Sequence, residues 1–169
     1  MTATRRHIDT ALKILPMDAA DIDEVVRIEA YSFARPWSRA LFLKELKNPL
    51  SYSFVVKCTP EGGVEKVCAY AVIWIVADEA HILDFAVEKD ERRRGLARRL
   101  LGFILGFMEE RFAAVVRLEV RRSNGAAIAL YESFGFEKEY ERKLYYGDED
   151  AIVMKKELEP AFSLRPDDE

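Results

Sequence analysis

The stretch Val87-Glu-Lys-Asp-Glu-Arg-Arg-Arg-Gly-Leu-Ala97 decides the fold, because a strand-like run ends in it and a helical pattern begins after its glycine. Upstream, residues 81–87 are rich in β-formers. Downstream, apolar residues recur at helical spacing: Leu96, Leu100, Leu101, Ile104, Leu105 and Met108. A helix starting near Gly95 directs free backbone N–H groups and the positive end of its dipole at whatever precedes it, and three arginines add charge. The turn therefore predicts a site for an anionic, phosphate-bearing ligand.

Two common phosphate-binding motifs are excluded by the glycine count of this turn. A Walker A loop ends in Gly-Lys followed by Ser or Thr, and a dinucleotide-binding fingerprint has three spaced glycines. Only Gly95 is present here. A single glycine between a strand and a helix recurs in many folds, so the turn alone identifies no family.

Composition points to one domain. The 169 residues are 50% hydrophobic, which is enough for one well-packed core, and the chain is too short for two. The net charge of −4 gives no overall attraction to nucleic acid or an anionic membrane. No apolar run approaches the roughly 20 residues of a membrane span, and residues 1–7 lack the apolar core of a signal peptide. We expect a cytoplasmic protein with a flexible start at 1–10, one domain at 11–158 and a polar tail at 159–169.

Periodicity and turn residues predict strands and helices along the whole domain. Asp18, Ser38 and Asn124 are placed to cap helices, and Gly135 lies where a left-handed residue ends one. These features indicate an α/β class. The expected strands are 11–17, 51–58, 64–76, 81–88, 115–121, 136–146 and 151–157, and the expected helices are 18–30, 38–47, 95–112 and 124–134.

The cysteines and histidines suggest no metal chemistry. Cys58 and Cys68 lie in strand-like runs and lack the spacing of a metal-ligand set. We expect buried, reduced thiols, with neither a zinc site nor a disulfide. His81 also lies in a strand-like run and is expected to be a structural histidine. The sequence therefore predicts no bound metal.

Several further motifs occur in the order and spacing of a known family. They are Pro36-Trp37-Ser38, Arg92-Arg-Arg-Gly95-Leu-Ala97, Leu118-Glu-Val-Arg-Arg-Ser-Asn124, Ala126-Ala-Ile-Ala-Leu-Tyr-Glu-Ser-Phe-Gly-Phe136, Tyr145-Tyr146 and Glu149-Asp-Ala-Ile-Val-Met154. This set resembles the GNAT superfamily of acetyl-CoA-dependent N-acetyltransferases, and within it the RimI branch, which acetylates N-terminal α-amines of proteins. The resemblance covers about residues 11–158. It implies a single GNAT domain with a mixed central sheet of about seven strands flanked by about four helices.

The resemblance also implies a cosubstrate, acetyl-CoA. The N–H groups of residues 93–98 would hold its pyrophosphate, and the main chain of residues 85–87 would bind its pantetheine arm like an added strand. Lys89, Arg92 and Ala97 replace a proline, a glutamine and a glycine that are common in the family. Instead of binding the cosubstrate, the arginines could simply be solvent-exposed residues at the start of a helix, and Asn124 could simply cap a helix. The implied cofactor-binding residues are Phe85, Ala86, Val87, Arg92, Arg93, Arg94, Gly95, Leu96, Ala97, Arg98 and Asn124.

Acetyl transfer to an amine needs a proton acceptor and a proton donor. An α-amine with a pKa near ~8 must lose a proton, and the departing thiolate benefits from receiving one. Glu119 lies in an otherwise apolar strand, where an ionised carboxylate is costly unless it is hydrogen-bonded or faces a wet cleft. The resemblance implies that Glu119 is the base and Tyr131 the acid. Without the resemblance, Glu119 could equally be a surface residue paired with Arg117 or Arg121, and Tyr131 could equally be a core side chain.

The acceptor side is implied by the resemblance alone, with Glu29, Trp37, Tyr145 and Tyr146 as substrate-binding residues. The implied reaction is direct transfer to a protein N-terminal α-amine, foremost the alanine of a small-subunit ribosomal protein. Two alternatives stay open: a GNAT enzyme that acts on lysine side chains or small amines, and a non-catalytic coenzyme A-binding module. Direct nucleic-acid binding is disfavoured by the acidic overall charge.

Overall fold

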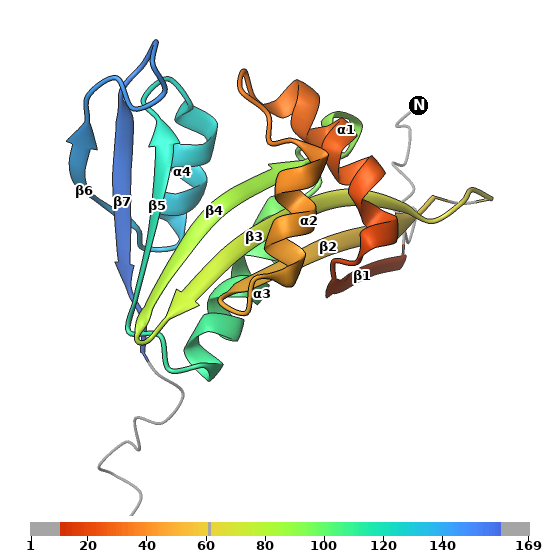
Figure 1. Ribbon diagram of the computed structural model, residues 1–169, viewed down its shortest axis with the longest axis horizontal. Coiled ribbons are helices and arrows are strands. Elements are labelled where there is room, and N and C mark those ends of the chain that lie inside the picture. The colour runs from red at the N-terminus through yellow and green to blue at the C-terminus, as the bar shows by residue number, and fades with distance from the viewer. Residues whose placement is uncertain (1–10, 61, 160–169) are drawn as a thin grey trace, which may run out of the picture.

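The computed structural model describes residues 11–60 and 62–159, so the predicted flexible start and all but the first residue of the predicted tail lie outside the described residues. Seven strands form one sheet in the order β1-β2-β3-β4-β5-β7-β6 (Figure 1). Only β4 and β5 pair in parallel, and every other pair is antiparallel. The predicted mixed sheet is confirmed. Its strands are β1 (Ala11–Pro16), β2 (Ser51–Thr59), β3 (Lys66–Val76), β4 (Glu79–Val87), β5 (Val115–Arg121), β6 (Glu137–Arg142) and β7 (Ala151–Glu157).

The four predicted helices are present, and the expected residues cap three helical starts. The side chains of Asp18, Ser38 and Asn124 each accept a backbone N–H of the first turn that follows. The helices are α1 (Ile22–Ser32), α2 (Arg39–Lys47), α3 (Leu96–Glu110) and α4 (Gly125–Ser133), with short 3-10 helices η1 (Ala19–Asp21) and η2 (Lys89–Glu91). None of the helices within 11–60 and 62–159 is long and apolar enough to cross a membrane.

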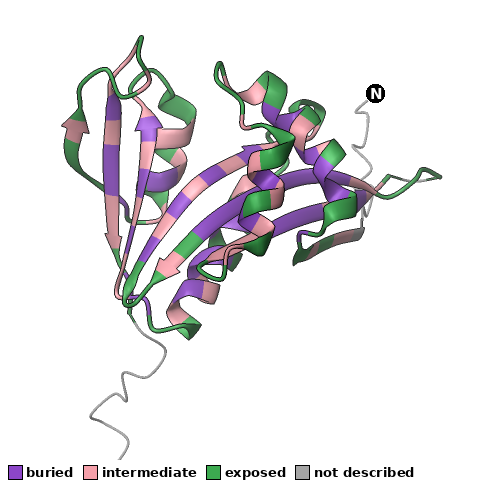
Figure 2. Cartoon of the chain, viewed as in Figure 1, coloured by how far each residue is buried: buried purple, intermediate pink, exposed green. Residues whose placement is uncertain are grey.

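Two apolar clusters fill the two faces of the sheet. The larger one lies beneath α3 and α4, and the smaller one beneath α1 and α2, which cross the front of β2–β4 in Figure 1. Strand β3 supplies both, because its side chains alternate: Ala71 and Ile73 face the larger cluster, and Tyr70 and Val72 the smaller. In Figure 2 the buried colour is continuous along the middle of β3, whereas along β4 buried residues alternate with partly exposed ones.

The sheet opens between β4 and β5. These strands pair only from Glu79–Ile82 against Val115–Leu118, although both continue beyond. Just past that point the β3–β4 register shifts, so that Ile73 pairs with Ile82 but Val72 pairs with Asp84. The bulge turns the end of β4 away from β5, and Figure 1 shows the two strands diverging. The backbone edge of residues 83–87 therefore faces a wedge instead of a neighbouring strand.

One predicted strand is too long. Strand β6 ends at Arg142 instead of 146, so Tyr145 and Tyr146 lie in the loop that leads to β7. Leu144 has a left-handed φ of 47°, and its N–H donates to the Asp150 carboxylate at 2.9 Å. The Asp150 carboxylate accepts the Leu144 N–H, which in a longer β6 would bond to a neighbouring strand. This local bond therefore closes a compact turn.

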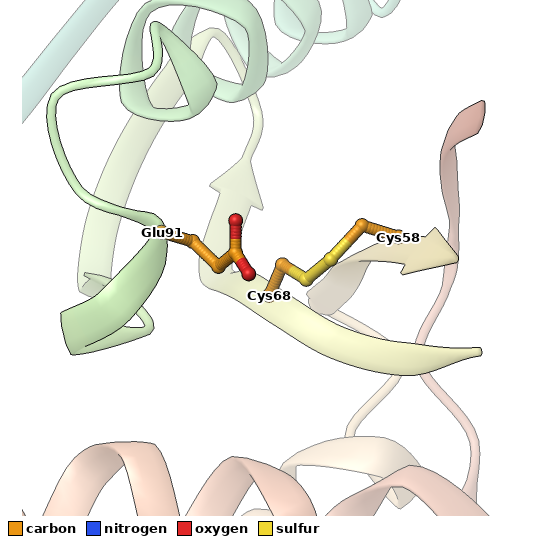
Figure 3. Close-up of side chains that lie close together, drawn as sticks. All are labelled: Cys58, Cys68 and Glu91. Carbon is orange, nitrogen blue, oxygen red and sulfur yellow. A yellow bond between two sulfur atoms is a disulfide. The ribbon is translucent and has the colours of Figure 1, made fainter. Parts of the chain in front are cut away.

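The cysteines correct a second expectation. Cys58 on β2 and Cys68 on β3 are both buried, but their sulfurs form a disulfide, with the Cα atoms 6.1 Å apart (Figure 3). The prediction of reduced thiols is wrong because chain spacing does not reveal strand register. The β2–β3 pairing, with its shift after Val56, brings both side chains into one cluster.

Glu91 of η2 lies beside this disulfide, and its carboxylate and the two sulfurs lie within 4.8 Å of one another (Figure 3). Sulfurs bonded to each other offer no thiolate to a metal. The Glu91 carboxylate is also engaged by Lys66 at 3.0 Å and by Arg94 at 2.9 Å. The expectation that no metal binds stays a prediction.

Candidate active site

A cleft of about 1310 Å³ occupies the wedge between β4 and β5. Its walls come from α1 and the segment after it, the end of β4, the turn before α3, β5, α4 and the β6–β7 loop. Of the residues predicted to form the site, only Arg94 and Tyr145 do not line it. Segments that lie up to 120 positions apart in the sequence, from Glu29 to Glu149, therefore meet around one cavity.

The predicted phosphate-binding turn lies at one end of the cleft. Gly95 is the N-cap of α3 with φ of 79°, and a Cβ built on it would meet no atom within 4 Å. The approach to the first turn of α3 is thus open, and its N–H groups have no acceptor within the helix. Arg92 donates to the Val87 carbonyl at 3.1 Å, and Arg94 pairs with Glu91, so these side chains hold the turn in shape. The backbone is what the turn offers to a phosphate.

The open edge of β4 continues from this turn. Residues 84–87 pair with β3 on one side, and on the other side they border the cleft where β5 has moved away. A main-chain edge left in this way can bind an extended amide-containing chain as an added strand. Coenzyme A has such an arm, joined to a pyrophosphate. The residues present therefore fit both parts of acetyl-CoA: the turn before α3 fits the pyrophosphate, and the free edge of β4 fits the amide-containing arm.

Glu119 lies on β5 and lines the cleft, with 15% of its side chain exposed. His81 Nε2 lies 2.6 Å from Glu119 Oε2, and Arg142 donates to Oε1 at 3.3 Å. Burial alone would raise the pKa of Glu119, but the hydrogen bond and charge of His81, with the charge of Arg142, lower it below its usual value. The carboxylate is therefore ionised at neutral pH. Its partners are not Arg117 or Arg121, which pair with other carboxylates.

Tyr131 of α4 approaches the same cleft from the other face of the sheet. Leu118 and Val120, the neighbours of Glu119, pack in the cluster that contains Tyr131, so the carboxylate and the phenol lie on opposite sides of β5. The Tyr131 ring lies 6.5 Å from that of Phe85. Burial, followed by the charge of Asp84, raises the pKa of Tyr131. The phenol is therefore a proton donor, not an anion, at neutral pH.

The predicted acceptor-side residues come from α1, the segment after it and the β6–β7 loop, and all but Tyr145 line the cleft. Glu29 is 1% exposed, and it accepts the backbone N–H of Trp37 at 2.7 Å. Tyr146 stacks under the Arg121 guanidinium at 4.4 Å, and burial raises its pKa to about 12. Tyr145 lies outside the cleft lining with its ring against Arg142 at 4.2 Å.

Sequence reasoning missed Asp84, which lines the cleft, and also His81 and Arg142, which contact Glu119 from outside the lining. Asp84 could have been identified from the sequence, since it is a carboxylate in an apolar strand, which is the pattern that identified Glu119. The sequence did not indicate His81 or Arg142, because their contact with Glu119 depends on the register of β4 and on the position of β6. The expectation that His81 is only structural did not foresee that contact.

Comparisons with known proteins agree with this geometry. Residues 20–136 match the model of the acetyltransferase (GNAT) family. The [ribosomal protein bS18]-alanine N-acetyltransferase of Escherichia coli strain K12 is 39% identical over 145 residues, which cover 83% of this chain and 94% of that protein.

Solved structures give the same result. The crystal structure of the ribosomal-protein-S18-alanine N-acetyltransferase from Escherichia coli superposes with a TM-score of 0.79 at 36% identity, covering 92% of this chain and 99% of that one. Ard1 from Thermoplasma volcanium superposes with a TM-score of 0.78 at 30% identity, covering 88% and 98%. The wedge, the phosphate turn and these likenesses together mean that the chain belongs to the acetyltransferase (GNAT) family and is an acetyl-CoA-dependent N-acetyltransferase.

Proposed function

We propose that this protein transfers the acetyl group of acetyl-CoA to the N-terminal α-amine of a protein, and that its acceptor is the alanine of a small-subunit ribosomal protein. The observation that carries the proposal is the 39% identity to a bS18-alanine N-acetyltransferase across 94% of that relative. The E. coli structure that superposes on 92% of this chain has the same named activity. An acceptor of this kind would place the enzyme in the cytoplasm.

We propose direct transfer with two proton-handling residues. The amine nitrogen attacks the thioester carbonyl, the carbon–sulfur bond breaks, and the amide forms. Glu119 takes the proton that the amine loses, directly or through a water molecule, and Tyr131 gives a proton to the departing sulfur. Both residues line the same cleft, and they reach it from opposite sides of β5, which supports these roles. Cys58 and Cys68 lie outside the cleft lining and are bonded to each other, which argues against a cysteine acyl-enzyme.

The remaining predicted residues have supporting roles in this proposal. Residues 85–87 and 92–98, with Asn124, hold the cosubstrate, chiefly through the backbone. Glu29, Trp37 and Tyr146 form the acceptor end of the cleft, and Tyr145 supports Arg142, which in turn holds Glu119.

The test is mass-spectrometric acetylation of a peptide panel with acetyl-CoA. The panel compares free Ala, Ser and Met N-termini with N-terminally blocked peptides that contain lysine. Labelling of the α-amine with a preference for alanine supports the proposal. Labelling of blocked lysine peptides alone would assign the enzyme to lysine side chains, and no labelling despite acetyl-CoA binding would favour a small amine or a non-catalytic module.

A further inference from the structure

Three buried polar side chains form a cluster beneath α1 that the proposed mechanism does not use. Glu29 of α1 is 1% exposed, Asp84 of β4 is 7% exposed, and Tyr70 of β3 is fully buried. The Tyr70 hydroxyl bonds to the Glu29 carboxyl and lies 3.4 Å from the nearer oxygen of Asp84. Both carboxyls, each more than nine-tenths buried, border the cleft. The cluster is therefore part of the active-site wall.

This cluster lacks a cation, unlike the other acidic side chains near the cleft. Glu88 pairs with Arg27 at 3.0 Å, and Glu119 pairs with His81 at 2.6 Å. Within the part of the chain that the structure describes, no lysine, arginine or histidine forms an ion pair with Glu29 or Asp84. Two buried carboxyls in contact cannot both ionise without one, because each charge raises the cost of the other.

The pair therefore holds one proton and one negative charge. Burial, followed by the nearby carboxyl of Glu29, raises the pKa of Asp84 well above its ordinary value. The Tyr70 hydroxyl, which donates to the Glu29 carboxyl, is kept protonated because burial raises its pKa. A single negative charge with no counterion thus lies in the wall of the cleft, one residue before Phe85 on the edge proposed to hold the thioester arm.

A charge in this position distinguishes the substrate of the reaction from its product. An α-amine has a pKa near ~8, so at neutral pH it arrives mostly as an ammonium ion, whereas its acetylated product is a neutral amide. We infer that the Glu29–Asp84 pair is the subsite that receives the acceptor's ammonium group and favours it over the acetylated product. The inference rests on the proposed function, which supplies the amine.

The subsite acts before the chemical step. The ammonium ion binds at the pair, its proton then passes to Glu119 as proposed, and the neutral amide formed has no charge to hold it at the wall. Binding of the ammonium is non-covalent and consumes no proton from the pair. The Glu29–Asp84 pair therefore favours binding of the amine substrate and does not hold back the neutral product.

The test measures binding without turnover. Calorimetry on the enzyme saturated with coenzyme A compares the peptide that the enzyme acetylates best with the same peptide already acetylated. The wild-type enzyme is expected to bind the free amine about tenfold or more tightly, as for one charge-assisted hydrogen bond. Equal affinity for the two peptides would overturn the inference even before any variant is made.

The decisive variant is the double substitution Glu29→Gln with Asp84→Asn, because in either single variant the other carboxyl can keep the charge. It is expected to reduce the preference to within about twofold to threefold while the affinity for acetyl-CoA is unchanged. Glu45→Gln is the matched control, since Glu45 is also buried and accepts an aromatic N–H, from Trp74 at 2.8 Å, but lies outside the cleft lining. It should retain the wild-type preference.

The outcomes separate this inference from the proposed function. A panel in which no α-amine is acetylated removes the proposed function. An enzyme that acetylates α-amines but binds amine and amide equally, or a folded double variant that keeps the full preference, removes the ammonium subsite alone.

Discussion

The two ends of the cleft are built in opposite ways. The proposed cosubstrate end is one stretch, residues 85–98, with Asn124 added, and it offers mainly backbone groups. The acceptor end is assembled from side chains of α1, β3, β4, β5, β6 and the β6–β7 loop. A backbone site depends on the path of the chain and tolerates many side chains, whereas a side-chain site fails when one functional group is changed. The two ends should therefore respond differently to substitution.

The largest effect is expected at the acceptor end, from a change of one functional group. Glu119→Gln keeps the shape of the side chain but cannot take a proton, so kcat should fall by about 10²–10⁴-fold while acetyl-CoA affinity stays the same. Steady-state kinetics and calorimetry check this. Glu139→Gln is the control, because Glu139 is also ion-paired to an arginine, Arg117 at 2.9 Å, but lies outside the cleft. An unchanged kcat in Glu119→Gln would remove Glu119 as the base.

A somewhat smaller effect is expected from the proton donor. Tyr131→Phe removes only the hydroxyl and keeps the aromatic contact with Phe85, so kcat should fall by about 10²-fold with little change in stability. The control is Tyr140→Phe, since Tyr140 is half exposed on β6. A peptide amine assay and a thermal melt measure both quantities, and a wild-type rate would show that another group protonates the sulfur.

The cosubstrate end should be broken by a change in the backbone path. Gly95→Glu places a side chain on a residue with φ of 79°, which costs about 1–2 kcal/mol, and puts a negative charge at the helix end that attracts phosphate. Acetyl-CoA should bind about 10²-fold more weakly. Gly106→Glu, on the same helix and also facing open space, is the matched control. Undiminished affinity of Gly95→Glu in calorimetry would contradict the assignment of this turn to the pyrophosphate.

The contrast between a site built from one stretch and a site built from distant segments also explains which features could be predicted from the sequence. The turn at Gly95, the capping residues Asp18, Ser38 and Asn124, and the strand at 115–121 were predictable, because each depends on neighbours in the chain. The disulfide, the short β6 and the partners of Glu119 were not, because each depends on how distant strands are registered. Family resemblance supplied the candidate base and acid, but it did not supply His81, which contacts Glu119, or Asp84, whose charge helps to raise the pKa of Tyr131.

The smallest effect is expected from His81, which touches the proposed base from outside the cleft lining. His81→Leu removes the main group that lowers the pKa of Glu119, while burial still opposes ionisation and only Arg142 compensates. The pKa of Glu119 should therefore rise. We expect most of the Glu119 carboxylate to remain ionised at pH 7 in the variant, so kcat/KM should differ there by less than about tenfold.

Acidification should enlarge that difference. A base acts only when ionised, so a raised pKa in His81→Leu makes the variant lose activity at a higher pH than the wild type. We divide the kcat/KM of His81→Leu by that of the wild type, which cancels the titration of the acceptor amine because it is common to both. This ratio should fall as the pH drops below about 6. His81→Gln keeps an N–H donor for Glu119 and should behave more like the wild type. A ratio that stays constant with pH would mean that His81 only supports the sheet and that Glu119 is held by Arg142 alone.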